Sequence, residues 1–366
     1  MTIKEIIAPI EAFAPPIYQE SYDNAGFQVG NPQAECTGAL LTLDVTEAVV
    51  QEAIDKNCNL IIAHHPLIFK GIKRITGKNS LERIIIKAIQ HNITIYAAHT
   101  NLDAMSMGVN YKIAEKLGIQ RPQILQPVRE KIYQLTTYVP VAEKEVVLNA
   151  LFKAGAGAIG NYNEAAFTHE GTGSFKPNDA ANPTIGTAGG PREYVNETRI
   201  EVIVPAAVKS KVLQSLFAAH SYETVAYNLV LLENENQTIG AGMIGTLPEP
   251  IPTQEFLKRI QTNMEAKVIR HTNLVKDTVQ KIAFCGGSGS FLLNDALQQG
   301  ADLFLTADYK YHQFFDAEDK IIIADIGHYE SEQFTIEIFN DILNKNFSNF
   351  AILLSQINTN PINYFI

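Results

Sequence analysis

The sequence contains few cysteines and no long apolar segment. Its three cysteines, Cys36, Cys58 and Cys285, form no Cys-x-x-Cys pair, which argues against a disulfide framework or a thiolate zinc site. Such sparing use of cysteine is typical of a reducing cytoplasm, where we expect the protein to reside. No apolar run approaches the ~20 residues of a membrane-spanning helix, and the first residues lack the pattern of a secretory signal, so we expect no membrane partner.

Basic residues are also fewer than acidic ones. The chain has 29 Lys and Arg against 39 Asp and Glu, which gives a formal net charge of -10. An acidic surface repels phosphate backbones, and this argues against nucleic acid as a partner. With 366 residues the chain is long enough for two or three domains with their own cores.

Helix and strand patterns alternate over the first third of the chain. This βαβ order indicates an α/β fold with a largely parallel sheet covered on both faces. The predicted helices span 3–13, 46–56, 80–91 and 109–117, and the predicted strands span 37–43, 59–63 and 93–98.

The pattern changes near Pro122 to Pro127. Between 128 and 237 the order becomes strand, helix, strand, strand, helix, strand, which indicates a ferredoxin-like α+β domain. The βαβ pattern resumes after a proline-containing segment, Gly240 to Pro252, with a helix at 253–264 and strands at 266–270, 281–284, 302–306 and 321–325. We therefore predict a discontinuous α/β domain with mixed, largely parallel sheets, made of halves 1–127 and 238–366, and an inserted domain at 128–237.

Polar side chains that can bind metal follow three of the predicted strands. His64 and His65 end one apolar run, Asp103 follows a second, and His328 and Glu332 follow a third. The carboxyl ends of strands are where open α/β sheets bind ligands. Imidazole and carboxylate without thiolate suit zinc, manganese, iron or magnesium. Five such groups predict two metals that share a bridging ligand.

Each of these residues also has an ordinary structural explanation. Asp103 alone could cap the next helix, and Glu332 alone could be a solvated helix residue. Two adjacent histidines can face one centre only if the strand ends or bends there, and Pro66 favours such an end. The i, i+4 spacing lets His328 and Glu332 face one point if a helix begins at His328.

Two further histidines are candidates for proton transfer at this centre. His99 lies four residues before Asp103, and its alternative role is to orient a metal ligand. His312 follows another strand end, a position equally consistent with a pocket residue and with a surface residue.

A glycine-rich segment, Cys285-Gly286-Gly287-Ser288-Gly289-Ser290, lies between a predicted strand and a predicted helix. Its amides could hold an anion such as a substrate phosphate, so Gly286, Gly287, Ser288 and Gly289 are a predicted anion-binding site. The segment is neither a Walker A motif nor a full GxGxxG motif, and the alternative is a tight strand–helix turn. We expect Cys285 to be a buried thiol.

The chain resembles the Ngg-interacting-factor-three family, also called GTP cyclohydrolase 1 type 2 homologues, in its long bacterial form with an inserted domain. The resemblance covers roughly residues 1–125 and 238–366. It rests on motifs at Tyr22–Gly30, Leu43–Thr46, Ala63–Pro66, His99–Asp103, Cys285–Gly289, Ala301–Leu303 with Lys310–His312, and Gly327–His328 with Glu332.

The resemblance implies that the five predicted ligands bind two divalent metals, with zinc expected and manganese or iron as alternatives. It also implies a toroidal homohexamer and an insert similar to the PII and CutA-like trimeric fold. We expect a metal-dependent hydrolase that acts on a nucleotide or another phosphorylated small molecule, in the manner of a GTP cyclohydrolase. The alternative is a non-catalytic metal-binding regulatory or interaction protein whose insert senses a ligand.

Overall fold

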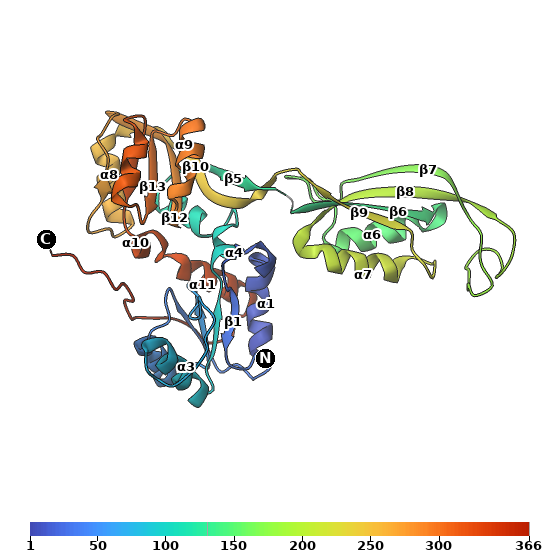
Figure 1. Ribbon diagram of the computed structural model, residues 1–366, viewed down its shortest axis with the longest axis horizontal. Coiled ribbons are helices and arrows are strands. Elements are labelled where there is room, and N and C mark those ends of the chain that lie inside the picture. Colours follow the sequence, from blue (N-terminus) through green and yellow to red (C-terminus); the bar gives the residue numbers. More distant parts are fainter. Residues whose placement is uncertain (130, 366) are drawn as a thin grey trace. The chain divides into compact units, whose positions relative to one another are not determined.

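The computed structural model describes residues 1–129 and 131–365. The described chain divides into two compact units (Figure 1). Unit 1 comprises Met1–Pro127 and Thr238–Ile366, and unit 2 comprises Val128–Gln237. Among the helices described, none is long and apolar enough to cross a membrane.

The first sheet of unit 1 has five strands in the order β1-β4-β3-β2-β15, of which only β1 is antiparallel to its neighbour. All residues of β2, β3 and β4 are buried, as their continuous apolar runs predict. Helices α1 and α11 pack on one face, and α2 and α3 pack on the other. The elements are α1 (Ile3–Phe13), β1 (Gly26–Val29), β2 (Ala39–Thr42), α2 (Glu47–Asp55), β3 (Leu60–Ala63), α3 (Ser80–Gln90), β4 (Thr94–Ala97), α11 (Thr335–Asn346) and β15 (Ile352–Leu354).

The second sheet of unit 1 has the order β11-β14-β13-β12-β10-β5. Its central strands β12, β13 and β14 are parallel, while β10 is antiparallel to β12 and β11 is antiparallel to β14. Helices α5 and α8 pack on one face, and α9 packs on the other. The elements are α5 (Val109–Leu117), β5 (Gln120–Val128), β10 (Asn236–Pro252), α8 (Thr253–Asn263), β11 (Arg270–His271), β12 (Thr278–Ser288), α9 (Leu293–Gln298), β13 (Leu303–Ala307) and β14 (Ile322–Asp325).

Two strands of this sheet occupy segments where prolines predicted a change of domain. β5 and β10 both contain prolines, yet both pair within the sheet. Pro248 and Pro250 fall where the pairing of β10 with β12 is interrupted, between Thr246 and Ile251. A proline cannot donate a hydrogen bond, so it is tolerated at such an interruption. The strand predicted at 266–270 is wrong, because only Arg270–His271 pairs there.

Unit 2 contains a four-stranded antiparallel sheet in the order β7-β8-β6-β9. Helices α6 and α7 pack together with the sheet around one apolar core. The elements follow the predicted order β-α-β-β-α-β. They are β6 (Ile132–Pro140), α6 (Lys144–Ala154), β7 (Ala166–Phe175), β8 (Glu193–Pro205), α7 (Lys209–Ala219) and β9 (Tyr227–Leu232).

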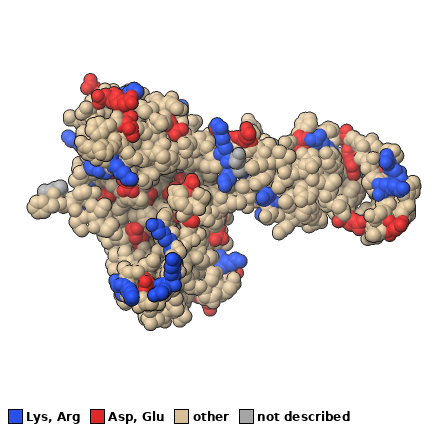
Figure 2. Space-filling model, in the orientation of Figure 1, with Lys and Arg blue, Asp and Glu red and all other residues tan. Residues whose placement is uncertain are grey.

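Charged side chains of both signs occur on the face of the molecule drawn in Figure 2. Lys and Arg lie interspersed with Asp and Glu on this face. A mixed surface with a formal net charge of -10 offers little bulk attraction to a phosphate backbone.

Candidate metal centre

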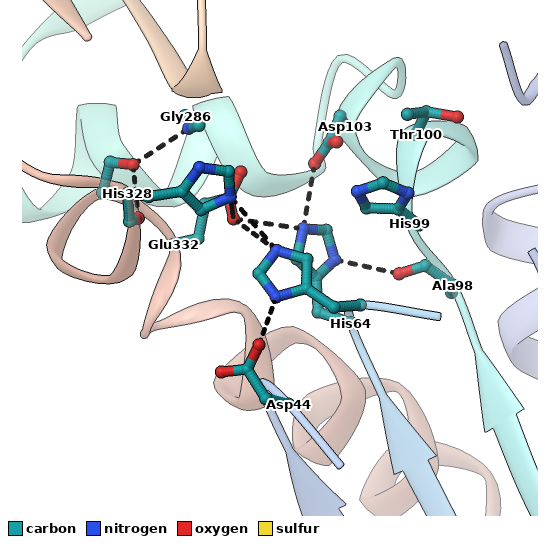
Figure 3. Close-up of polar contacts among 12 residues, drawn as sticks. Asp44, His64, Ala98, His99, Thr100, Asp103, Gly286, His328 and Glu332 are labelled. Carbon is teal, nitrogen blue, oxygen red and sulfur yellow. Dashed lines mark hydrogen bonds and ion pairs between the residues drawn. The ribbon is translucent and has the colours of Figure 1, made fainter. Parts of the chain in front are cut away.

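Side chains from both sheets of unit 1 converge on one point (Figure 3). From the first sheet, His64 and His65 follow β3, and the short helix α4 (Thr100–Asp103) follows β4. From the second sheet, the short helix α10 (His328–Glu332) follows β14. The carboxyl ends of parallel strands therefore supply all five predicted ligands.

The chain bends at the two adjacent histidines. β3 ends at Ala63, and the amides of His64 and His65 donate to the carbonyl of Leu43 at 3.2 and 3.0 Å. The two rings then lie with centroids 4.9 Å apart instead of pointing to opposite faces of a sheet. This is the strand end that the sequence requires if both histidines are to face one centre.

Four histidines near this point each use Nδ1 for a hydrogen bond within the protein. The acceptors are the Ala98 carbonyl for His64 (2.9 Å), Asp44 for His65 (2.7 Å), Asp23 for His99 (2.8 Å) and Asp308 for His328 (2.7 Å). A carbonyl or carboxylate oxygen can only accept, so Nδ1 carries the hydrogen in each ring. Nε2 is left to bind a metal or a proton.

The Nε2 atoms converge on the carboxylate of Glu332. Glu332 Oε2 lies 2.9 Å from Nε2 of His65, 3.0 Å from Nε2 of His328 and 3.7 Å from Nε2 of His64. Three groups of potential ligands lie at this point, and within each group the ligand atoms lie within 4.8 Å of one another. One group is His64–His65–His99, and the other two are His65–His328–Glu332 and His64–Asp103–Glu332. Glu332 belongs to the latter two groups.

Two buried atoms at this point have no hydrogen-bond partner in the described chain. They are Nε2 of His64 and Oδ1 of Asp103, which lie 3.5 Å apart. A buried polar atom without a partner costs free energy, and such atoms are rare in native proteins. A divalent cation would satisfy both atoms, so the residues present fit a metal.

Charges within the cluster depend strongly on one another. Burial opposes ionisation of Glu332, but His328 and the hydrogen bonds from the histidines hold the pKa of its carboxyl well below the usual value. Burial also opposes a charge on the rings of His65 and His328, yet hydrogen bonds to Asp44 and Glu332 raise the pKa of His65 to about 9. The charges of Glu332 and Asp308 raise the pKa of His328 to about 11. Without metal, the cluster therefore retains protons at neutral pH.

The glycine-rich segment makes room for Glu332. At Gly287, where φ is +61°, a Cβ would collide with Oε1 of Glu332. The amide of Gly287 donates to Ser331 Oγ at 2.9 Å, and those of Gly286 and Gly289 donate to Asn110 and Thr306. Because these three donors are already used within the protein, the geometry does not favour the predicted anion site at residues 286–289.

The other predicted site residues have distinct surroundings. Asp103 is the last residue of α4, and the following helix α5 has Gly108 at its N-cap, so the capping explanation for Asp103 is wrong. A ring nitrogen of His99 lies within 4.8 Å of those of His64 and His65. His312 is exposed on the 3-10 helix η5 (Tyr311–Ala317) and lies outside the groups of potential ligands found in the described chain.

The thiol of Cys285 behaves as expected for a buried cysteine. The side chain is buried, and burial raises the pKa of the thiol above its usual value. The group therefore stays protonated at neutral pH and is no candidate nucleophile.

The sequence-based prediction missed the three carboxylates that hold histidine rings. Asp44 lies two residues beyond β2, and Asp308 directly follows β13, so both carry the strand-end signal that identified the histidines. Asp23 lies in a loop before β1 and gives no such signal. It also accepts hydrogen bonds from the amide and the hydroxyl of Thr100.

Known proteins resemble this chain over nearly its whole length. A family model described as Duf34/NIF3 (NGG1p interacting factor 3) matches residues 1–361. A protein of Halalkalibacterium halodurans called GTP cyclohydrolase 1 type 2 homolog is 40% identical over 325 residues, which cover 88% of this chain and 87% of the relative. A Bacillus subtilis protein of the same name is 36% identical over 367 residues, 99% of this chain and 98% of the relative. The crystal structure of a Bacillus cereus protein related to NIF3 superposes with a TM-score of 0.87 at 37% identity and covers 100% of this chain and 99% of that one.

The carboxylates that accept hydrogen bonds from Nδ1 of His65 and His328 give a first prediction. We expect Asp44→Asn and Asp308→Asn each to weaken zinc or manganese binding by about 10–100-fold, because the ring orientation and the basicity of Nε2 depend on these acceptors. Calorimetric titration of metal-stripped protein measures the change. Asp55→Asn, on the exposed surface of α2, is the matched control and should bind as the wild type does. Equal affinity in all three variants would contradict the assigned role.

Gly287 gives a second prediction, with a close control in Gly300. Gly300 has a similar φ of +70°, but a Cβ there would meet no atom within 4 Å, whereas a Cβ at Gly287 would collide with Glu332. Alanine strains the backbone at both positions. We expect only Gly287→Ala to lower metal affinity, by about tenfold or more, through displacement of Glu332. A similar loss in Gly300→Ala would show that backbone strain alone is responsible.

The raised pKa values of His65 and His328 give a third prediction. Both values lie above 7, so both rings are protonated in the metal-free protein at neutral pH, and a metal must displace these protons from Nε2. Burial and the charge of Glu332 raise the pKa of Asp103 to about 8, so its carboxyl also holds a proton at pH 7. We expect release of about three protons on loading at pH 7 and an affinity that rises with pH through about 9. Titration calorimetry in buffers of different ionisation enthalpy counts the protons. Binding without proton release would contradict the charge assignment.

Proposed function

The chain belongs to the Duf34/NIF3 family, and from this premise we propose that it is a dinuclear divalent-metal protein that hydrolyses a nucleotide or another phosphorylated small molecule. One observation carries the proposal. Two groups of potential ligands share Glu332, and Nε2 of His64 and Oδ1 of Asp103 are buried there without partners in the described chain.

Each group would hold one cation. His65 and His328 would bind the first, His64 and Asp103 would bind the second, and Glu332 would bridge the two. Divalent cations bound there would supply Lewis acidity, which polarises an electrophile and lowers the pKa of water. Nitrogen and oxygen donors without thiolate suit zinc, and manganese or iron(II) are the alternatives.

The exposure of the cluster favours a reactive site over a closed structural one. The side chains of His328, Asp103 and His65 are 36%, 27% and 21% exposed. Glu332 and His64 lie beneath them, at 3% and 0%. The cluster is therefore partly open to solvent, whereas structural zinc sites are usually closed and rich in thiolate.

His99 is the side chain best placed to move a proton at this site. Its Nδ1 donates to Asp23, and hydrogen bonds from His99 and Thr100 outweigh burial and lower the pKa of Asp23 to about 2. Asp23 therefore remains an anionic acceptor and fixes the orientation of the ring. Nε2 of His99 is then available to accept a proton from an attacking group or to return one to a leaving group.

The names of the relatives suggest the first substrate to examine. Two relatives are called GTP cyclohydrolase 1 type 2 homolog, so a nucleoside triphosphate heads the list of candidates. A homohexamer is the assembly that the family resemblance predicts, and we include it in the proposal.

Metal-dependent turnover is the experiment that tests this function. The protein is stripped of metal, reloaded separately with zinc, manganese or iron(II), and assayed against a panel of nucleoside phosphates and sugar phosphates. We expect turnover that requires metal and falls by about 100-fold or more in His65→Ala, which removes a metal ligand. His169→Ala, an exposed histidine of unit 2, is the control and should keep full activity.

Each outcome of this assay separates the candidate functions. Formate release from GTP supports a cyclohydrolase, while phosphate release keeps the hydrolase class and replaces the reaction. Two bound metals without turnover of any panel member would favour the non-catalytic metal-binding alternative. Fewer than two metals per chain would overturn the dinuclear site itself.

A further inference from the structure

Unit 2 contains a cavity of about 440 Å³ that is built without any residue of the metal centre. It lies where the end of β7, the loop that joins β7 to β8, and the segment between α7 and β9 meet. Figure 1 shows this long loop beyond the ends of β7 and β8. The volume is within the range of about 300–1,000 Å³ typical of small-molecule sites.

Hydrogen bonds hold the loop in place over the cavity. The amide of Asn182 donates to Glu223 Oε1 at 2.9 Å, and the Thr184 hydroxyl donates to the carbonyl of Ser221 at 2.8 Å. Within the loop, the amide of Gly189 donates to the carbonyl of Asn178 at 3.0 Å. The donor and the acceptor of each of these hydrogen bonds lie in unit 2, so the fold of this unit alone forms the cavity wall.

The wall of the cavity is mostly apolar and aromatic. It includes Tyr138, Phe175, Tyr222, Pro177, Pro183 and Ile185. The buried ring of His220 supports two of the aromatic residues, since its Nε2 donates to the carbonyl of Tyr138 at 2.9 Å and its Nδ1 accepts from the amide of Tyr222 at 3.1 Å. The rings of Phe175 and Tyr222 lie 6.2 Å apart. The aromatic wall is therefore fixed before any ligand binds.

Two carboxylates, those of Glu197 and Glu223, line the cavity, and Glu197 has no basic partner in the described chain. Its Oε1 accepts a hydrogen bond from the Tyr222 hydroxyl at 3.1 Å. Its Oε2 lies against the backbone of Gly173, where a Cβ would collide with it. Among the described residues, no Lys or Arg forms an ion pair with Glu197 or lines the cavity. Burial and the charge of Glu197 raise the pKa of Tyr222 to about 12, so its hydroxyl remains a donor.

We propose that this cavity binds a small organic cation, a protonated amine or amidine on an apolar or aromatic body. The cationic group would face the free oxygen of Glu197, because a charge-assisted hydrogen bond is about twice as strong as a neutral one. The body would pack against Tyr138, Phe175 and Tyr222, whose ring faces also attract a cation. Anionic phosphates are disfavoured, since Glu197 and Glu223 both line the cavity. The ligand class is thus distinct from the substrate proposed for the metal centre.

Binding of simple aromatic cations to the full-length protein tests the proposal. Benzamidine and 2-phenylethylamine are titrated calorimetrically, with neutral benzamide and anionic benzoate as matched controls. We expect saturable binding of a cation, at least about tenfold weaker binding of benzamide, and no binding of benzoate. Saturable binding of neither cation would overturn the proposal, as would equal affinity for benzamidine and benzamide.

Variants locate the bound cation within unit 2. Glu197→Gln keeps an oxygen that can accept from Tyr222 but removes the charge, and we expect at least about a tenfold loss of affinity. Glu170→Gln, on the exposed surface of β7, should bind as the wild type does. Unchanged affinity in Glu197→Gln would overturn the proposal.

A second variant guards against a folding defect in the first. Ala181→Phe fills the cavity from the loop and leaves Glu197 in place, so it should also lose cation binding. Metal binding at the centre in unit 1 should be unchanged in both variants, which shows that their effect is confined to unit 2. Full cation binding in Ala181→Phe would place the cation elsewhere and would overturn the proposal.

Discussion

The buried carboxylate of Glu332 is the constraint on which the candidate metal centre depends. Its side chain is only 3% exposed, and a buried charge is costly unless neighbours compensate for it. His65 and His328 supply that compensation through Nε2. The Nδ1 of each ring donates a hydrogen bond to a further carboxylate, that of Asp44 or Asp308. The backbone of Gly287 leaves the space that the carboxylate occupies. The fold itself therefore orients the donors of the centre, and a metal would enter a site that is already arranged.

The arrangement of parallel strands explains how such distant residues meet. Parallel strands place their carboxyl ends at one edge of a sheet, and the loops that follow them lie side by side. In the first sheet these loops carry Asp44 and the two adjacent histidines, and in the second sheet they carry Asp308 and His328. His65 and Glu332 are 267 positions apart in the chain, so no local element could pair them. The centre exists only when both sheets of unit 1 are folded and packed against each other.

The same arrangement sets how much the sequence could predict. A buried strand is visible as an apolar run, and a histidine at its end is conspicuous, so the candidate ligands could be identified before the structure was known. Asp44 and Asp308, which accept hydrogen bonds from two of these ligands, carry the same strand-end signal. Asp23 does not, because its pairing with His99 spans 76 positions and follows no periodicity. Gly287 was assigned to an anion site, but its lack of a side chain instead leaves space for Glu332. The sequence alone cannot distinguish a glycine whose amide binds an anion from one that leaves space for a neighbouring side chain. The strand β10 was not predicted, because its prolines interrupt the pairing and leave no continuous strand pattern in the sequence.

The point of insertion explains how a second binding site could be added without disturbing the first. β5 and β10 are neighbours in the second sheet, and unit 2 lies between them in sequence. Two neighbouring strands need only a short connection, so a folded unit can replace that connection while the pairing of the sheet is kept. All proposed metal ligands belong to unit 1, and all residues that line the cation cavity belong to unit 2. Any influence of a bound cation on metal chemistry would then have to appear as a coupling free energy between two separately built sites, and by linkage it would act equally in both directions.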